Sequence, residues 1–173
     1  MIFKDISNFN NTRDYLPILN GCINADLFVL FFVFHGIFKS VSLKKWYKKY
    51  HLHSVLADTL ILIIGIILAR FLYKYFFTTF TIWNFTGLAV VIQIIHDVLF
   101  YLFFRSLPAG YNAMLDFFKE YANEVGVAAI WGDSFTMIMA CLLSSHFATY
   151  NTNLNIITLI ISLYFFPYMI NYE

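Results

Sequence analysis

Charged side chains are scarce in this chain of 173 residues, of which Lys, Arg, Asp and Glu together make up 12%. A soluble domain carries about 25% charged residues, so this sequence has about half the charge that a water-facing surface needs. The formal net charge of +1 provides no basic surface for a polyanion, which argues against nucleic-acid binding. The only cysteines, Cys22 and Cys141, show no metal or redox spacing and exclude a disulfide framework.

Apolar side chains are abundant instead: 61% of the residues are hydrophobic, and there are 21 Phe and 12 Tyr. A helix needs about 20 mainly apolar residues to cross a hydrocarbon layer roughly 30 Å thick. The stretches that meet this requirement are 19–38, 55–73, 81–104, 125–148 and 154–170. The first contains Asp26 and the fourth contains Asp133, so the sequence leaves four spans open as the alternative to five. We therefore predict an all-α integral membrane bundle, a single membrane domain over residues 1–173.

A run of lysines follows the first predicted span without an acidic residue among them: Lys39, Lys44, Lys45, Lys48 and Lys49. An excess of basic residues in short loops marks the cytoplasmic side. The basic residues predicted for the opposite side are Lys4, Arg13, Arg70 and Lys74. With five spans, this places the N-terminus outside and Glu173 inside. The polar start of the chain lacks a basic segment followed by an apolar run, so we expect the first span to act as its own insertion signal.

The lysine-rich segment has two interpretations. It can serve only as a topology determinant. Alternatively, Lys44, Lys45, Lys48 and Lys49 form a patch that contacts anionic lipid or an acidic partner, because Trp46, Tyr47 and Tyr50 interleave the lysines like an interfacial belt.

The segment 110–125 shows the pattern of an amphipathic helix. Its apolar residues recur at i, i+3, i+4 and i+7, namely Tyr111, Met114, Leu115, Phe118, Ala122 and Val125. The opposite face carries Asn112, Asp116, Lys119 and Asn123, which is too polar to cross lipid. We expect this helix to lie along the membrane interface, either as a connector or as a docking surface for another protein.

Ionisable side chains inside spans are costly, at about 2.5–3.5 kcal/mol each near the helix centre. The spacing along the spans predicts that several of them lie at one depth, in an intramembrane polar cluster of His35, Asp58, Gln93, His96, Asp97 and Asp133. Such a cluster can pin helices in register, bind a divalent metal ion, or share a proton between carboxyl groups. The identity of any metal stays open, and no other cofactor is expected.

Small residues recur every four positions in the fourth predicted span, at Gly132, Thr136, Ala140 and Ser144. Small side chains let helix backbones approach closely in lipid. We therefore expect this span to be the central packing helix, with Asp133 facing protein, and the stripe also permits a homo-oligomer.

Enzyme signatures do not emerge. Gly132-Asp133-Ser134 is not the G-x-S-x-G turn of a serine hydrolase. Asp97 and Asp133 on neighbouring spans suggest an intramembrane aspartyl protease, but that family's GxGD motif would need glycine where Ile130 stands. The sequence names no catalytic residue and favours a non-enzymatic protein, with catalysis left open.

Residues 96–134 carry a resemblance that extends from His96-Asp-Val-Leu-Phe-Tyr through Tyr111-Asn-Ala-Met-Leu-Asp-Phe-Phe to Gly132-Asp-Ser. This stretch resembles small multi-pass membrane proteins of large nucleocytoplasmic DNA viruses. The resemblance implies a structural role in an internal virion membrane or a host-derived membrane, in contact with capsid or other virion proteins. The alternative is a small proton- or metal-linked channel or carrier that uses the intramembrane Asp and His residues.

Overall fold

The computed structural model describes residues 2–171, and these residues form α-helices joined by short connections, with no strand among them. A 3₁₀ helix, η1 (Thr12–Asp14), precedes α1 (Tyr15–Phe34), α2 (Val41–Tyr50), α3 (Leu52–Phe76), α4 (Ile82–Ser106), α5 (Ala113–Val125), α6 (Ala128–Phe147) and α7 (Thr152–Ile170). The predicted all-α bundle is confirmed.

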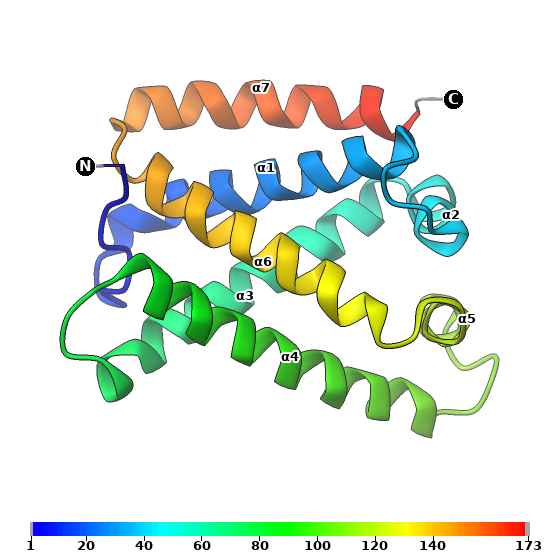
Figure 1. Ribbon diagram of the computed structural model, residues 1–173. Coiled ribbons are helices and arrows are strands. Elements are labelled where there is room, and N and C mark those ends of the chain that lie inside the picture. Colours follow the sequence, from blue (N-terminus) through cyan, green and yellow to red (C-terminus); the bar gives the residue numbers. More distant parts are fainter. Residues whose placement is uncertain (1, 172–173) are drawn as a thin grey trace.

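Five of these helices are long and apolar enough to cross a membrane: the segment Thr12–Phe34, which includes α1, and α3, α4, α6 and α7. The five-span alternative is thus the one that fits, and the chain has the architecture of a multi-pass membrane protein. The long helices run side by side (Figure 1), with the N-terminal segment at one end and α2 and α5 together at the other. Helices α2 and α5 therefore lie on one side of the bundle, as the five-span topology requires. The predicted location of Glu173 lies outside the described residues.

The first span begins earlier than the apolar pattern predicts. We expected it over 19–38, whereas α1 covers Tyr15–Phe34. The helix ends because Gly36 adopts a φ of +69°, a left-handed conformation that glycine reaches without a steric penalty. Its polar first half is helical because Asn20 finds a partner on another helix: its side-chain amide donates to the backbone carbonyl of Asn155, at 2.8 Å, and to the Asn155 side-chain oxygen, at 2.9 Å.

Helix α6 packs along both α1 and α4, but α1 is the central helix of the bundle, because it packs against α3, α6 and α7 and is the most buried of the five spans. The closest approach is to α1, where a Cβ atom added at Gly21 would lie 2.1 Å from Ser144 Oγ and 2.7 Å from Ser144 Cα. Ala140 and Ser144 are buried, but Gly132 is exposed and would have no atom within 4 Å of an added Cβ. The prediction is therefore wrong for Gly132, because the buried residues of α6 begin only at Ser134.

The N-terminal segment folds across the end of the bundle opposite α2 and α5 (Figure 1). Lys4 exchanges backbone and side-chain hydrogen bonds with Ser145 at the end of α6. Arg70 of α3, with its side chain 0% exposed, donates to the backbone carbonyls of Asn8 and Asn11 and lies 3.5 Å from a carboxylate oxygen of the equally buried Asp14. We had counted Arg70 among the basic residues on the side of the N-terminus. Arg70 does lie at that end of the bundle, where its buried side chain holds the N-terminal segment in place.

Candidate functional site

Two short helices lie across the ends of the spans on one side of the bundle, and Figure 1 shows α2 and α5 there nearly end-on. We refer to α2 and α5 together as the platform. Helix α5 was expected, over 110–125, and is present over Ala113–Val125. Helix α2 was expected only as a lysine-rich loop. The sequence does contain features that predict this helix. Ser40 is a residue type that favours the N-terminal cap of a helix, and its hydroxyl accepts from the Leu43 backbone N–H. Apolar residues then recur at helical spacing after Ser40.

An aromatic layer joins the platform to the spans. The Trp46 ring of α2 lies 5.2 Å from the ring of Phe117 and 5.0 Å from that of Phe118, both on α5. Phe118 in turn lies 5.2 Å from the ring of Phe100 on α4. The inner face of α5 therefore centres on Phe117 rather than on Tyr111, which we had placed there and which is 70% exposed. The apolar face of α5 thus packs partly against α2 and α4, with Phe117 as its buried residue.

Polar contacts fix the two platform helices to each other. Lys45 Nζ lies 2.8 Å from a carboxylate oxygen of Glu120, and this pairing raises the pKa of Lys45 and lowers that of Glu120. The Glu124 carboxylate accepts from the backbone N–H groups of Val41 and Ser42, each at 3.0 Å, and from the Ser42 hydroxyl. A negative charge is favourable at this position because the first N–H groups of α2 lack partners within the helix.

Acidification should loosen the platform. The hydrogen bonds from Ser42 hold the pKa of Glu124 below its ordinary value of 4.5. A carboxyl group with a lowered pKa in the folded state contributes stability above the unfolded pKa, and this contribution is lost as the pH falls through the folded value. We therefore expect Trp46 fluorescence, measured with Trp83→Phe and Trp131→Phe in place, to shift to longer wavelength as the pH falls below 4.5. In Glu124→Gln the shift should already be present at pH 7; identical pH curves for both proteins would contradict the role of Glu124.

Beneath the platform, two carboxyl groups of neighbouring spans accept hydrogen bonds. Asp58 of α3 accepts from the Trp46 indole N–H at 3.0 Å and from the Tyr47 hydroxyl. Asp26 of α1 is buried and accepts from the hydroxyl of Thr59. Burial, followed by the charge of Asp58, raises the pKa of Tyr47 well above its ordinary value, so this hydroxyl stays a donor. The platform thus supplies donors directly to acids of the spans.

A second group of polar side chains connects α4 and α6. Asp97 accepts from the Gln93 amide, and its carboxylate lies 3.2 Å from His96 Nδ1. Gln93 also accepts from the Ser134 hydroxyl of α6 at 2.9 Å. The carboxyl groups of Asp97 on α4 and Asp133 on α6 lie close enough for the charge of Asp97 to act on Asp133.

These two groups form one acidic cluster. Electrostatic interactions link Asp26 to Asp58, Asp58 to Asp133 and Asp133 to Asp97, so that four spans each contribute one carboxyl group. Tyr121 of α5 lies close enough to be affected by the charge of Asp133, although burial is the main reason why its pKa is raised.

Only some of the residues predicted for the intramembrane polar cluster thus lie close to one another. The structure brings Gln93, His96, Asp97 and Asp133 together and links Asp58 to them. His35 lies at the end of α1, exposed, where its Nδ1 is 2.9 Å from the Phe31 carbonyl and its ring stacks on Phe31.

Two details differ from the sequence-based expectation. Asp26, which we had not placed in the cluster, belongs to it. Asp133, which we expected to be shielded by protein, is exposed at the surface of α6 even though it interacts with Asp97. Val127 and Trp131, near the start of α6, are exposed as well, and the buried residues of this helix begin at Ser134.

The closeness of Asp97 and Asp133 allows the two carboxyl groups to share a proton. Two carboxyl groups in contact cannot both ionise at low cost, so a pair of this kind holds one proton between them. Within residues 2–171, no three His, Cys, Asp or Glu side chains are arranged to hold a metal ion.

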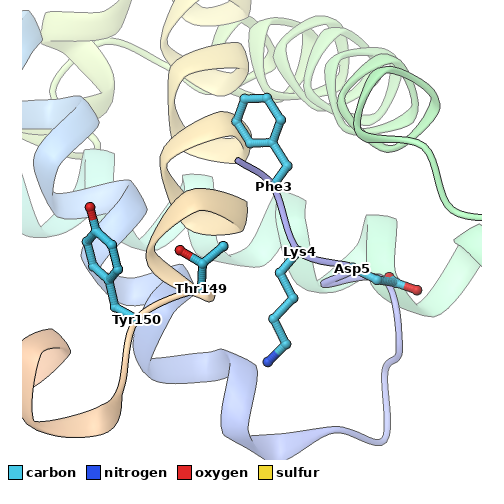
Figure 2. Close-up of a pocket in the computed structure, with 5 residues that line it drawn as sticks. All are labelled: Phe3, Lys4, Asp5, Thr149 and Tyr150. Carbon is cyan, nitrogen blue, oxygen red and sulfur yellow. The ribbon is translucent and has the colours of Figure 1, made fainter. Parts of the chain in front are cut away.

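A pocket of about 560 Å³ lies at the opposite end of the bundle, lined by Phe3, Lys4, Asp5, Thr149 and Tyr150. Figure 2 shows that the polar ends of these side chains point in different directions. This pocket therefore lacks the convergent polar groups of a binding site. In comparisons with protein-family models, curated proteins and solved structures, nothing matched this chain.

Proposed function

We propose that the protein is a non-enzymatic membrane anchor of a viral membrane, whose bundle of spans holds the platform against a neighbouring protein layer such as a capsid. The observation that carries the proposal is the fixed contact between α2 and α5 through Glu124 and the Lys45–Glu120 ion pair. A connection between spans needs no such contact, whereas a docking surface benefits because a rigid surface loses less conformational entropy on binding. The viral setting follows from the resemblance of residues 96–134.

Crosslinking in purified particles tests this proposal. A photo-reactive residue placed at Asn123, exposed on α5, should crosslink to capsid or other virion proteins. The same residue placed at Ile160, 61% exposed on α7, should crosslink to lipid and not to these proteins. Recovery of the protein from host membranes only, and never from particles, would overturn the proposal.

A second function is favoured by the Asp97–Asp133 contact. Asp133 is exposed and the Asp97 side chain is 22% exposed, so both carboxyl groups can be reached from outside the bundle. Intramembrane carboxyl pairs of this kind serve in proton relays. The protein would then act as a small proton-linked channel or carrier.

Proton flux into proteoliposomes distinguishes the second function from the first. If the pair relays protons, Asp97→Asn and Asp133→Asn should each lower the flux at least about tenfold, as expected when a positioned proton-transfer group is lost. Asp116→Asn is the matched control. Asp116 is also an aspartate, but it lies on α5, outside the spans, and pairs with Lys119. Equal flux in all three variants and in liposomes without protein would exclude the carrier.

A further inference from the structure

Among the lysines of α2, Lys45 pairs with Glu120, whereas Lys44, Lys48 and Lys49 form no ion pair within residues 2–171. The acids of α5 are all engaged: Asp116 lies 3.2 Å from Lys119, Glu120 pairs with Lys45, and Glu124 binds the first N–H groups of α2. No acidic residue occurs in the sequence between Asp26 and Asp58.

Four lysines of the segment 39–49 therefore have no ion pair with any residue that the structure describes: Lys39, Lys44, Lys48 and Lys49. Lys44 packs over the Phe34 ring, at 5.8 Å, and is half-buried. Lys39, Lys48 and Lys49 are exposed. The surface of α2 thus carries an excess of positive charge, since Glu120, on which the charge of Lys49 acts, already pairs with Lys45.

Exposed apolar side chains locate these lysines relative to the membrane. Helix α3 presents a stripe of exposed apolar residues at every fourth position, namely Leu52, Leu56, Leu60, Ile64 and Leu68. The stripe faces away from the bundle, as lipid-facing residues do, and it begins three residues after Lys49. Helix α2 joins α3 directly through His51, which adopts a φ of +46°, so no flexible linker separates the lysines from the first apolar residue.

The same arrangement recurs at the other end of the lysine segment. Ile37, 58% exposed, and Val41, 79% exposed, lie on either side of Lys39. Lysines interleaved with exposed apolar residues are typical of segments that lie at the boundary between hydrocarbon and headgroups. A docking surface for an acidic protein would not need this apolar component, which favours lipid as the occupant.

We propose that Lys39, Lys48 and Lys49 bind the phosphate groups of anionic phospholipids in the leaflet next to the platform. The inference is independent of the protein partner proposed above, since lipid binds at the edge of α2, where the exposed apolar residues lie. Each lysine at the headgroup level should raise the preference for an anionic over a zwitterionic lipid about fivefold, and added salt should weaken the preference.

Competition between two lipids tests the proposal on the purified full chain. Protein in neutral detergent is mixed with equal amounts of phosphatidylglycerol and phosphatidylcholine, and the lipids that stay bound are counted by native mass spectrometry. Lys48→Gln/Lys49→Gln should lower the preference for phosphatidylglycerol about 25-fold. The matched control is Arg13→Gln/Lys74→Gln, which removes two exposed positive charges at the other end of the bundle and should leave the preference unchanged.

Three outcomes would overturn the proposal. The first is equal binding of both lipids by the wild-type protein. The second is an equal loss of preference in both double variants, which would show an effect of net charge only. If inorganic phosphate displaced the lipid at millimolar concentration, the site would bind free phosphate and not a headgroup. None of these outcomes bears on the crosslinking to virion proteins, so the two proposals fail separately.

Discussion

Replacing Gly21 by alanine should destabilise the bundle by about 3 kcal/mol, at the upper end of what overpacking of a well-packed core costs. The added Cβ atom would lie 2.5 Å from the backbone nitrogen of Ser144 and 2.7 Å from its Cα atom. Backbone atoms cannot rotate away as the end of a side chain can, so α1 and α6 must separate along the contact that holds the centre of the bundle. The loss should appear as a lower midpoint in thermal unfolding of the protein in a mild detergent.

Gly87→Ala is the matched control for this experiment. Gly87 lies within the span α4, and an added Cβ atom would have no neighbour within 4 Å. Alanine is also the better helix former, so this variant should be as stable as the wild type or slightly more stable. Equal destabilisation by the two substitutions would show that the α1–α6 contact is not as close as described.

Removing the Arg70 charge should cost about 3–5 kcal/mol, as is usual when one partner of a buried ion pair is lost. In Arg70→Met the buried carboxylate of Asp14 keeps only Lys4 as a basic neighbour, at 3.7 Å, and the carbonyls of Asn8 and Asn11 lose their donor. The N-terminal segment should then detach from the bundle. Thermal unfolding reports the loss of stability, and cleavage by added protease within residues 2–11 reports the detachment.

Two further variants separate this effect from a general effect of charge. Lys74 lies one turn beyond Arg70, is exposed and lies over the rings of Phe71 and Tyr75, so Lys74→Met should change stability little. The double variant Arg70→Met/Asp14→Leu removes both charges and should recover most of the lost stability, because a buried ion pair is often replaced by apolar residues without loss. A double variant as unstable as Arg70→Met would contradict the ion-pair explanation.

The number and the approximate extent of the spans could be predicted because the apolar runs are long and the charges between them few. The errors in the predicted spans arose where polar side chains form hydrogen bonds with residues that are distant in the sequence. Asn20 and Asp26 made the first half of α1 look unlike a span, since their partners, Asn155 and Thr59, lie on other helices. The predicted start was therefore four residues late, which is roughly 6 Å along a helix. This shift concealed that Asp26 lies at the depth of Asp58.

The acidic cluster could be predicted only in part for a related reason. The depth of a residue along a span follows from the sequence, and the matching depths of Asp97 and Asp133 predicted correctly that these two residues lie close together. The direction in which a side chain points around the helix depends on which neighbours pack against it. Asp133 precedes the first buried residue of α6 by one position, and no sequence pattern marks where that packing begins.

The five spans differ in length, and the surrounding bilayer must adapt to this. Helices α3 and α4 have 25 residues each, about 37 Å along the axis, whereas α7 has 19 residues, about 28 Å. Long helices meet a layer of fixed thickness by tilting, and short ones draw the two leaflets closer together. The perimeter of the bundle is therefore uneven, and we expect the bilayer to be thinner beside α7 than beside α3. Such a protein favours regions of a membrane that already bend or thin.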